Sequence, residues 1–365
     1  MFLLGSNASY LHFRLNFYSV PFAASLMFTT LGLWLWLKAT PERHPGRGEH
    51  VHVGSWSVAG AQPLSLRYLA AGAACIAANF GCRPTFALSA LLCFPIFWPQ
   101  ITSLLQGLKS RSLPPRRALR APAAVIIPAL IVVLPLMAYN VARFGSPLDF
   151  GNDYQMTVTD MTRFVQPTAN FLPSVGAYLF LPLRFTSEFP FIGMTPMAFR
   201  EWGYYELMAG GLFATCPLLL LALAAPFLRR RMHRSGYWGL ATCSLALAVL
   251  LAVFDSHTAG LGWRYICDFG WMMAIAALAP MLYLMHPGGD AIAAGAPDPS
   301  ERNEPRRDVT KRHPMVLACV RGLVVAVLMA SIILAVLACF IPGRDDSLIN
   351  NNPVLYDTVV AWFRL

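Results

Sequence analysis

Charged residues are scarce in this chain. Only 13% of its 365 residues are Asp, Glu, Lys or Arg, whereas 56% are hydrophobic. Soluble domains carry roughly 25% charged residues, so this composition excludes an ordinary water-facing surface. The apolar residues come in blocks of about 20, which is the length that a helix needs to cross a bilayer. The sequence therefore predicts an integral membrane protein of the all-α class.

Several common functional signatures are also absent. The sequence contains no P-loop, no Gly-x-Gly-x-x-Gly loop and no convincing nucleophile elbow. The net charge is +10, but the basic residues lie in short clusters between apolar blocks, so we expect them to meet lipid headgroups and not nucleic acid. The eight cysteines lie within or beside apolar blocks and are expected to be packing residues. His44, His50 and His52 have no supporting ligands nearby, and neither a metal site nor another cofactor is evident.

The apolar blocks predict a polytopic bundle of about eight transmembrane helices. Arg83 and Pro84 interrupt one apolar block of 30 residues. Proline breaks a helix and a buried arginine is expensive, so a hairpin of two short helices, with Arg83 near its turn, explains this block better than one long span. The spans are predicted at residues 17–37, 69–81, 85–98, 123–139, 207–228, 237–254, 265–285 and 315–341.

Lysine and arginine counts in the short loops predict the orientation. The loops at 107–120, 229–234 and 286–314 carry five, four and five positive residues. The positive-inside rule places these loops in the cytoplasm, and the composition of 286–314 predicts a disordered loop. The segment 140–206 and the polar tail 342–365 then face outward. We expect 140–206 to lie along the membrane surface as short interfacial helices.

The same topology leaves the N-terminus outside, although no signal peptide precedes it. Residues 1–5 are similar to the end of an apolar helix. We therefore expect that spans upstream of this sequence are missing.

The stretch after the span at 123–139 is the most informative for function. Asn140 is followed by Arg143 within Arg-Phe-Gly-Ser-Pro, which predicts a fixed turn at the membrane interface. One interpretation is that Arg143 is an interfacial anchor. The other is that its guanidinium binds a lipid-linked phosphate, because guanidinium groups can bind phosphate through two parallel hydrogen bonds.

A second group of polar residues precedes the span at 265–285. Arg264 and Asp268 are four residues apart, so on a helix they would share a face and could pair. An ionisable residue at this depth is a functional candidate by default, but a structural ion pair between helices explains the pattern equally well. Asp255 and His257 lie in the predicted loop at 255–264; an isolated Asp-x-His is a weak metal or acid–base motif.

The order of these motifs carries a resemblance. A helix pair is broken by Gly-Cys-Arg-Pro-Thr (81–85), a span ends in Asn-x-x-Arg-Phe-Gly-Ser-Pro-x-x-Phe-Gly (140–151), and a later span follows Arg-Tyr-x-x-Asp-Phe (264–269). Over roughly residues 1–285 this order resembles the bacterial multi-spanning glycosyltransferases of the GT-C superfamily, which includes the dolichyl-phosphate-mannose-type mannosyltransferases.

The resemblance implies transfer of a sugar from a polyprenyl-phosphate donor to an acceptor on the outer face of the plasma membrane. Arg143 and Arg264 match family-like positions, and we expect them to contact the donor phosphate. In the family the catalytic carboxylate follows the first span, and this sequence begins beyond that loop, so no catalytic acid can be transferred to it. The outward carboxylates that we would test as the base are Asp153, Asp160, Glu188 and Glu201.

Two other classes remain open. A transporter would show inverted repeats and mid-span charges, and the sequence shows neither clearly. A non-catalytic membrane scaffold fits a chain that lacks the catalytic loop. In each case membrane lipids are the expected partners, and a lipid-linked sugar is added if the glycosyltransferase prediction holds.

Overall fold

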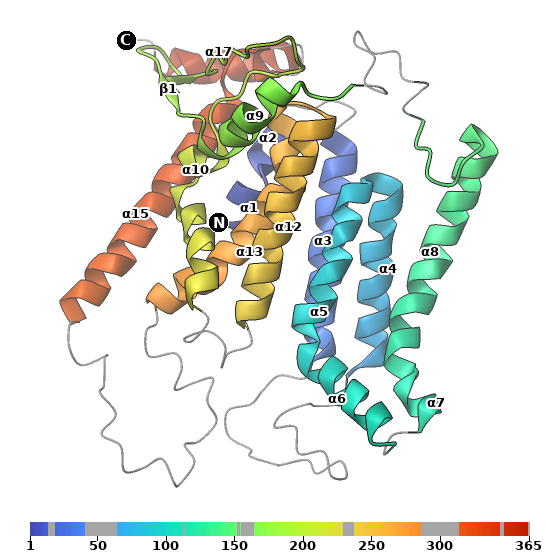
Figure 1. Ribbon diagram of the computed structural model, residues 1–365. Helices are drawn as coiled ribbons and strands as arrows, with labels where there is room; N and C mark the ends of the chain where they lie inside the picture. Colours follow the sequence, from blue (N-terminus) through green and yellow to red (C-terminus); the bar gives the residue numbers. More distant parts are fainter. Residues whose placement is uncertain are drawn as a thin grey trace.

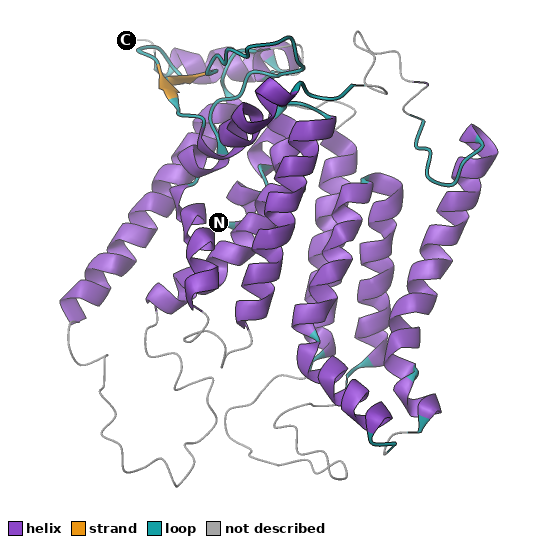
Figure 2. Cartoon of the chain, viewed as in Figure 1, coloured by secondary structure: helices purple, strands orange, loops and turns teal. Residues whose placement is uncertain are grey.

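The described part of the computed structural model is mostly helical, with one short β-hairpin (Figures 1 and 2). The structure describes residues 1–13, 19–40, 64–111, 114–151, 154, 164–228, 237–285, 314–343 and 347–363. The predicted loop at 286–314, apart from Pro314, lies outside these residues, as do Asp153 and Asp160. Within the described residues the predicted all-α class is confirmed.

Among the described residues, five helical segments are long and apolar enough to cross a membrane. A helix satisfies its backbone hydrogen bonds internally, which is what a chain inside lipid requires, so these segments identify an integral membrane protein. The count differs from the predicted eight: it is five, or up to six if one bent helix pair forms a single span. The five are α3 (Ser19–Ala39), α8 (Arg120–Phe144), α12 (Tyr237–Thr258), the segment Trp263–Met285, and Met315–Cys339 within α15 (Pro314–Cys339).

The chain breaks at Arg83, where the sequence predicts a turn. Helix α4 (Leu66–Cys82) ends there, and Arg83 is extended, with φ −147° and ψ 104°. Pro84 explains the break, because proline disfavours helical geometry in the preceding residue. The following helices are η1 (Pro84–Leu92), α5 (Cys93–Ile96) and α6 (Trp98–Lys109), with a bend of 65° between Pro84–Ile96 and α6.

The predicted span at 207–228 is shorter in the structure. Helix η3 (Pro217–Leu228) has only 12 residues, and the four-residue helix α10 (Leu212–Thr215) precedes it. Between them Cys216 has φ −139° and ψ 82°, because it precedes a proline and leaves the helical region. Apolar composition alone therefore overestimated the length of this span.

Two groups of helices form the bundle (Figure 1). In one, α4 packs against α3 and α8, and Gly32 and Gly72 permit a close approach: a Cβ on Gly72 would lie 2.4 Å from Trp36. Small residues allow membrane helices to approach closely in this way. In the other group, α13 (Ile266–Met285) packs against α12 and η3, and its side chains Phe269 and Trp271 are fully buried.

Short elements cover one end of the bundle. Helix α17 (Pro353–Ala361) lies across this end, above the upper turns of α15 and near β1 (Figure 1). Strands β1 (Arg184–Phe185) and β2 (Ile192–Gly193) form an antiparallel hairpin. We call the end that carries α9, this hairpin and α17 the capped end. The remaining short helices are α1 (Phe2–Gly5), α2 (Ala8–Phe13), α7 (Pro115–Ala118), α9 (Thr168–Phe180), η5 (Trp263–Tyr265) and α16 (Leu348–Asn351).

Candidate functional site: two arginines beside Tyr265

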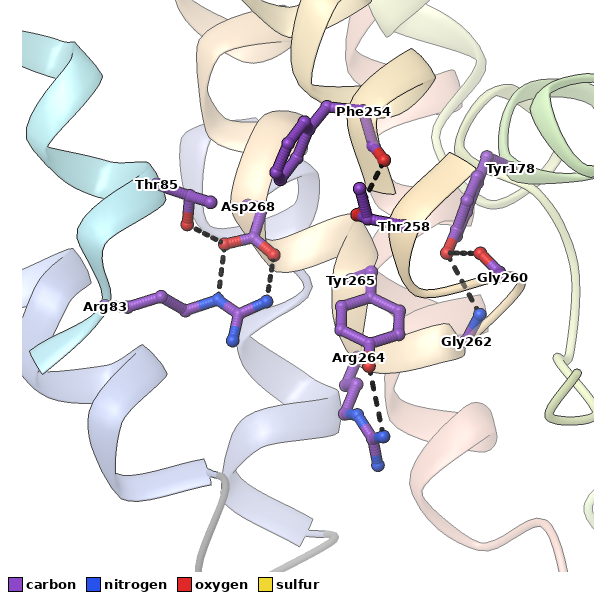
Figure 3. Close-up of polar contacts among 10 residues, drawn as sticks. All are labelled: Arg83, Thr85, Tyr178, Phe254, Thr258, Gly260, Gly262, Arg264, Tyr265 and Asp268. Atoms are coloured by element: carbon purple, nitrogen blue, oxygen red, sulfur yellow. Dashed lines mark hydrogen bonds and ion pairs between the residues drawn. The ribbon is translucent and has the colours of Figure 1, made fainter. Parts of the chain in front are cut away.

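Asp268 lies at the centre of a buried polar network in the first turn of α13 (Figure 3). The Arg83 guanidinium donates from Nε to Oδ1 at 2.6 Å and from Nη2 to Oδ2 at 2.5 Å. The Thr85 hydroxyl donates to Oδ1 at 2.7 Å. The Asp268 side chain is fully buried, whereas 23% of the Arg83 side chain is exposed. Two parallel charge-assisted hydrogen bonds fix both orientation and distance.

The local chain explains how Arg83 reaches Asp268. Because α4 ends at Cys82, the Arg83 side chain leaves the helix at the break and crosses to α13. Its guanidinium carbon lies 4.0 Å from the centroid of the Phe22 ring, which supplies a cation–π contact. A carboxylate in the first turn of a helix also interacts favourably with the helix dipole. The helix break before Pro84 therefore positions the Arg83 guanidinium beside Asp268.

A second network surrounds Arg264. Its Nη1 lies 2.8 Å from Glu206 Oε1, and the Tyr204 hydroxyl donates to the same oxygen at 2.6 Å. Arg264 Nη2 donates to the hydroxyl oxygens of Tyr204 at 3.3 Å and Tyr265 at 3.2 Å. Burial, and then the negative charge of Glu206, raise the pKa of Tyr204 to about 12. The Tyr204 phenol therefore stays protonated at neutral pH and donates to the carboxylate.

Tyr265 joins the two networks. Its ring centroid lies 5.5 Å from the guanidinium carbon of Arg83 and 5.0 Å from that of Arg264. Figure 3 shows the Tyr265 ring directly above the Arg264 side chain, to the right of Arg83 and Asp268. Both distances fall within the range of cation–π contacts. The site consequently holds two cations beside one aromatic ring.

Backbone pairing holds the second network in place. Residues 204–206 pair with 260–262: Leu261 N donates to Tyr204 O at 3.0 Å, and Glu206 N donates to Leu261 O at 2.7 Å. The Tyr178 hydroxyl of α9 donates to Gly260 O at 2.9 Å and accepts from Gly262 N at 3.0 Å (Figure 3). These contacts connect the segment before α10 to the start of α13.

Gly260 is required for this pairing. Its φ is +78°, a conformation that favours glycine. A Cβ at this position would lie 2.4 Å from the Tyr204 carbonyl oxygen. The chain can approach residues 204–206 this closely because position 260 has no side chain.

The predicted pair of Arg264 and Asp268 is wrong: the two side chains take different partners. Asp268 binds Arg83, and Arg264 binds Glu206. Spacing of four residues brings side chains together only on a continuous helix. Here Arg264 belongs to the 3₁₀ turn η5, and the α-helix begins at Ile266, so the assumed helical geometry does not apply.

Arg143 lies outside both networks, on α8. Its side chain is exposed. Its Nη1 donates to the Tyr139 hydroxyl at 2.8 Å, and its guanidinium carbon lies 4.9 Å from the Phe144 ring centroid. These contacts match the interfacial-anchor interpretation, because arginine and aromatic side chains gather at membrane surfaces. Arg264 therefore contacts Tyr265, whereas Arg143 contacts Tyr139 and Phe144.

Two of the four predicted carboxylates, Glu188 and Glu201, lie outside both networks. Both residues are exposed, and their backbone carbonyl oxygens accept hydrogen bonds: Asn170 Nδ2, for example, donates to Glu201 O at 2.8 Å. Asp153 and Asp160 lie outside the described residues. Glu206 and Arg83 were not predicted as site residues from the sequence. The signal for Arg83 was its presence inside an apolar block, where a cation requires a partner.

No group of three His, Cys, Asp or Glu side chains that could hold a metal ion occurs within the described residues. The network instead offers guanidinium N–H donors, carboxylates and phenol hydroxyls. Such groups can bind an anion or transfer a proton. The structure defines the chain as an integral membrane helix bundle with a buried ionic network at the start of α13. No family model, no curated protein and no solved structure matches this chain.

Proposed function

We propose that the chain is a membrane protein of the GT-C glycosyltransferase type that binds a polyprenyl-phosphate-linked sugar at the capped end. The observation that carries this proposal is the placement of Arg83 and Arg264 beside one ring, with guanidinium carbons 5.5 and 5.0 Å from the centroid of Tyr265. Ionisable groups inside a membrane protein are expensive and mark functional sites by default. Guanidinium groups also match the geometry of phosphate.

Arg83 has hydrogen-bonding capacity to spare. Its Nε and Nη2 bind Asp268, whereas Nη1 makes no hydrogen bond within the described part of the chain. The side chain is 23% exposed, so a ligand can reach it. Arg264 is 15% exposed. A phosphate at this place would receive charge-assisted hydrogen bonds in a poorly hydrated setting, where such bonds are strong.

The proposed orientation follows from the basic loops. With the loops at 107–120, 229–234 and 286–314 in the cytoplasm, the capped end faces outward. The short helices α4, η1–α5 and η3 would then complete the set of about eight spans. For transfer, an outward carboxylate would take the proton of the acceptor hydroxyl as the acceptor attacks the anomeric carbon. Glu201, an exposed residue, is the candidate nearest to Glu206 in the sequence.

Ligand binding in lipid nanodiscs tests the proposal. Undecaprenyl phosphate is titrated onto the full chain, onto Arg264→Gln and onto Arg184→Gln, a matched control that removes an exposed arginine of β1. Loss of a charge-assisted hydrogen bond of about 1.5–3 kcal/mol corresponds to at least about tenfold weaker binding for Arg264→Gln, with no change for the control. Equal affinity for all three proteins would exclude Arg264 as a phosphate contact.

A non-catalytic scaffold is the second candidate. The observation that favours it is that Arg83 and Arg264 are each already paired with a carboxylate, as in a network that only ties helices together. The two candidates differ in turnover. A glycosyltransferase releases polyprenyl phosphate from a polyprenyl-phosphate sugar when an acceptor is present. A scaffold does not release it, and its stability depends on the network without any ligand.

A further inference from the structure

Asp255 is a buried carboxyl that the donor site does not use. It lies in the last turn of α12, and only 2% of the residue is exposed. Its Oδ2 is buried and has no hydrogen-bond partner among the described residues. The sequence predicts a loop from residue 255, but α12 continues to Thr258 and carries Asp255 into the bundle. A buried carboxyl oxygen without a partner requires an explanation.

The groups around Asp255 come from each side of α12. Asp268 of α13 and Arg83 at the α4–η1 break are its electrostatic neighbours. Tyr178 of α9 interacts with Asp255 in the same way. The other helices packed against α12, namely η3, α5 and η1, carry no charged residue. On α12 itself the exposed His257 lies edge-on to Phe171, at 6.1 Å between ring centroids.

The charges of Asp255, Asp268 and Arg83 do not cancel if both carboxyls are ionised. Arg83 is the one cation among these neighbours, and two of its nitrogens bind the two oxygens of Asp268. If both carboxyls were ionised, the group would carry a net charge of −1 in a buried setting, where an uncompensated charge is strongly disfavoured. Asp255 therefore needs a positive charge of its own.

We propose that Asp255 is a proton-binding site, present as the neutral carboxylic acid while Asp268 remains the carboxylate partner of Arg83. The proton forms an O–H bond on Asp255 and leaves the group neutral. A bound metal ion is a less suitable source of this positive charge, because no set of three metal-ligating side chains occurs within the described residues. The proposal does not depend on what binds beside Tyr265.

Infrared spectroscopy of the full chain in nanodiscs tests the proposal directly. At about pH 7 ordinary Asp and Glu side chains are ionised, so the carbonyl stretch of a carboxylic acid reports a protonated group. We expect one such band in the wild type, its loss in Asp255→Asn, and its retention in Asp357→Asn, which changes an exposed aspartate of α17. The band should be the same in sodium and potassium buffers.

Three results would overturn the proposal. A wild type without the acid band would mean that Asp255 is ionised. A band that survives Asp255→Asn would place the proton elsewhere, for instance on Asp268. A band that disappears when sodium is added would mean that a metal ion supplies the counter-charge.

A stability measurement provides a second test. Asparagine has the shape of the neutral acid, so Asp255→Asn should fold and match the wild-type melting temperature near pH 4. Near pH 7 Asp255→Asn should melt above the wild type, whereas Asp268→Asn should melt below it. In the wild type the unfolded carboxyl ionises above about pH 4 while the folded one stays protonated. The unfolding equilibrium constant of the wild type should rise about tenfold per pH unit relative to Asp255→Asn. A pH-independent ratio would contradict the proposal.

Discussion

Arg83 and Asp268 form a bidentate ion pair between residues that are 185 positions apart in the sequence, with Nε–Oδ1 and Nη2–Oδ2 distances of 2.6 and 2.5 Å. The pair joins the end of α4 to the first turn of α13. Those helices belong to the two different groups that form the bundle. Since the Asp268 side chain is fully buried, this contact couples the packing of one group to the other.

Arg83→Met should destabilise the protein strongly. The substitution keeps an apolar stem near Phe22 but leaves Asp268 buried without its cation. Removing one partner of a buried ion pair costs about 3–5 kcal/mol. Unfolding in detergent, followed by circular dichroism, measures the loss.

The exposed Arg184 supplies the matched control, because Arg184→Met should change stability by no more than about 0.5 kcal/mol. Adding Asp268→Asn to Arg83→Met should restore part of the lost stability, since the unpaired charge is then gone. Unchanged stability in Arg83→Met would mean that the ion pair contributes nothing to the fold.

Tyr178→Phe should loosen the contact between α9 and the turn at 260–262. The hydroxyl satisfies both Gly260 O and Gly262 N, and a buried group left without its partner costs about 1–3 kcal/mol. Hydrogen exchange at the Gly262 amide should rise in parallel. Tyr205→Phe is the control: Tyr205 is 46% exposed, so a stability loss of equal size there would contradict the role assigned to Tyr178.

The Tyr204 phenol should ionise at a higher pH than an ordinary tyrosine. Its folded pKa is about 12, above the value of about 10 for an unfolded tyrosine. The stability that comes from this difference is fully present below about pH 10 and is lost as the pH rises towards 12. Phenolate absorbance of the wild type minus that of Tyr204→Phe gives the midpoint. Glu206→Gln should lower this midpoint, because Glu206 raises the pKa; a midpoint that does not move would contradict the contact.

Gly260→Ala should be more harmful than Gly145→Ala. Both glycines have a positive φ, +78° and +80°, so both substitutions incur the backbone strain of about 1–3 kcal/mol. Only at position 260 would the new Cβ meet a neighbour, the Tyr204 carbonyl oxygen at 2.4 Å, whereas nothing lies within 4 Å at position 145. Equal losses in thermal unfolding would show that the approach of 204–206 to 260–262 is unimportant.

The membrane character and most helix positions could be predicted from the sequence, because a block of about 20 apolar residues matches the length of a membrane-spanning helix. The chain break at Arg83 was also predictable, since Pro84 restricts the residue before it. The length of the helix at 217–228 could not be predicted in this way. Hydropathy does not report where a proline such as Pro217 divides an apolar block.

The site was harder to predict for a different reason. The sequence marks Arg264 and Asp268 as candidate positions, but their partners depend on tertiary contacts. Glu206 reaches Arg264 only because residues 204–206 pair with 260–262. Asp255 reaches the interior only because α12 continues past residue 254. A single sequence shows local spacing, and neither of these contacts is local.

The separation of Arg83 from Asp268 also sets the order of assembly during synthesis. The ribosome makes Arg83 185 residues before its partner, so the helices that precede α13 enter the bilayer before Arg83 has a carboxylate partner. Arg83 is then expected to stay near water or within the insertion machinery until α13 is made. A chain that terminates before residue 268 would keep this exposed charge, and the quality-control proteases of the membrane would have a signal for recognising it.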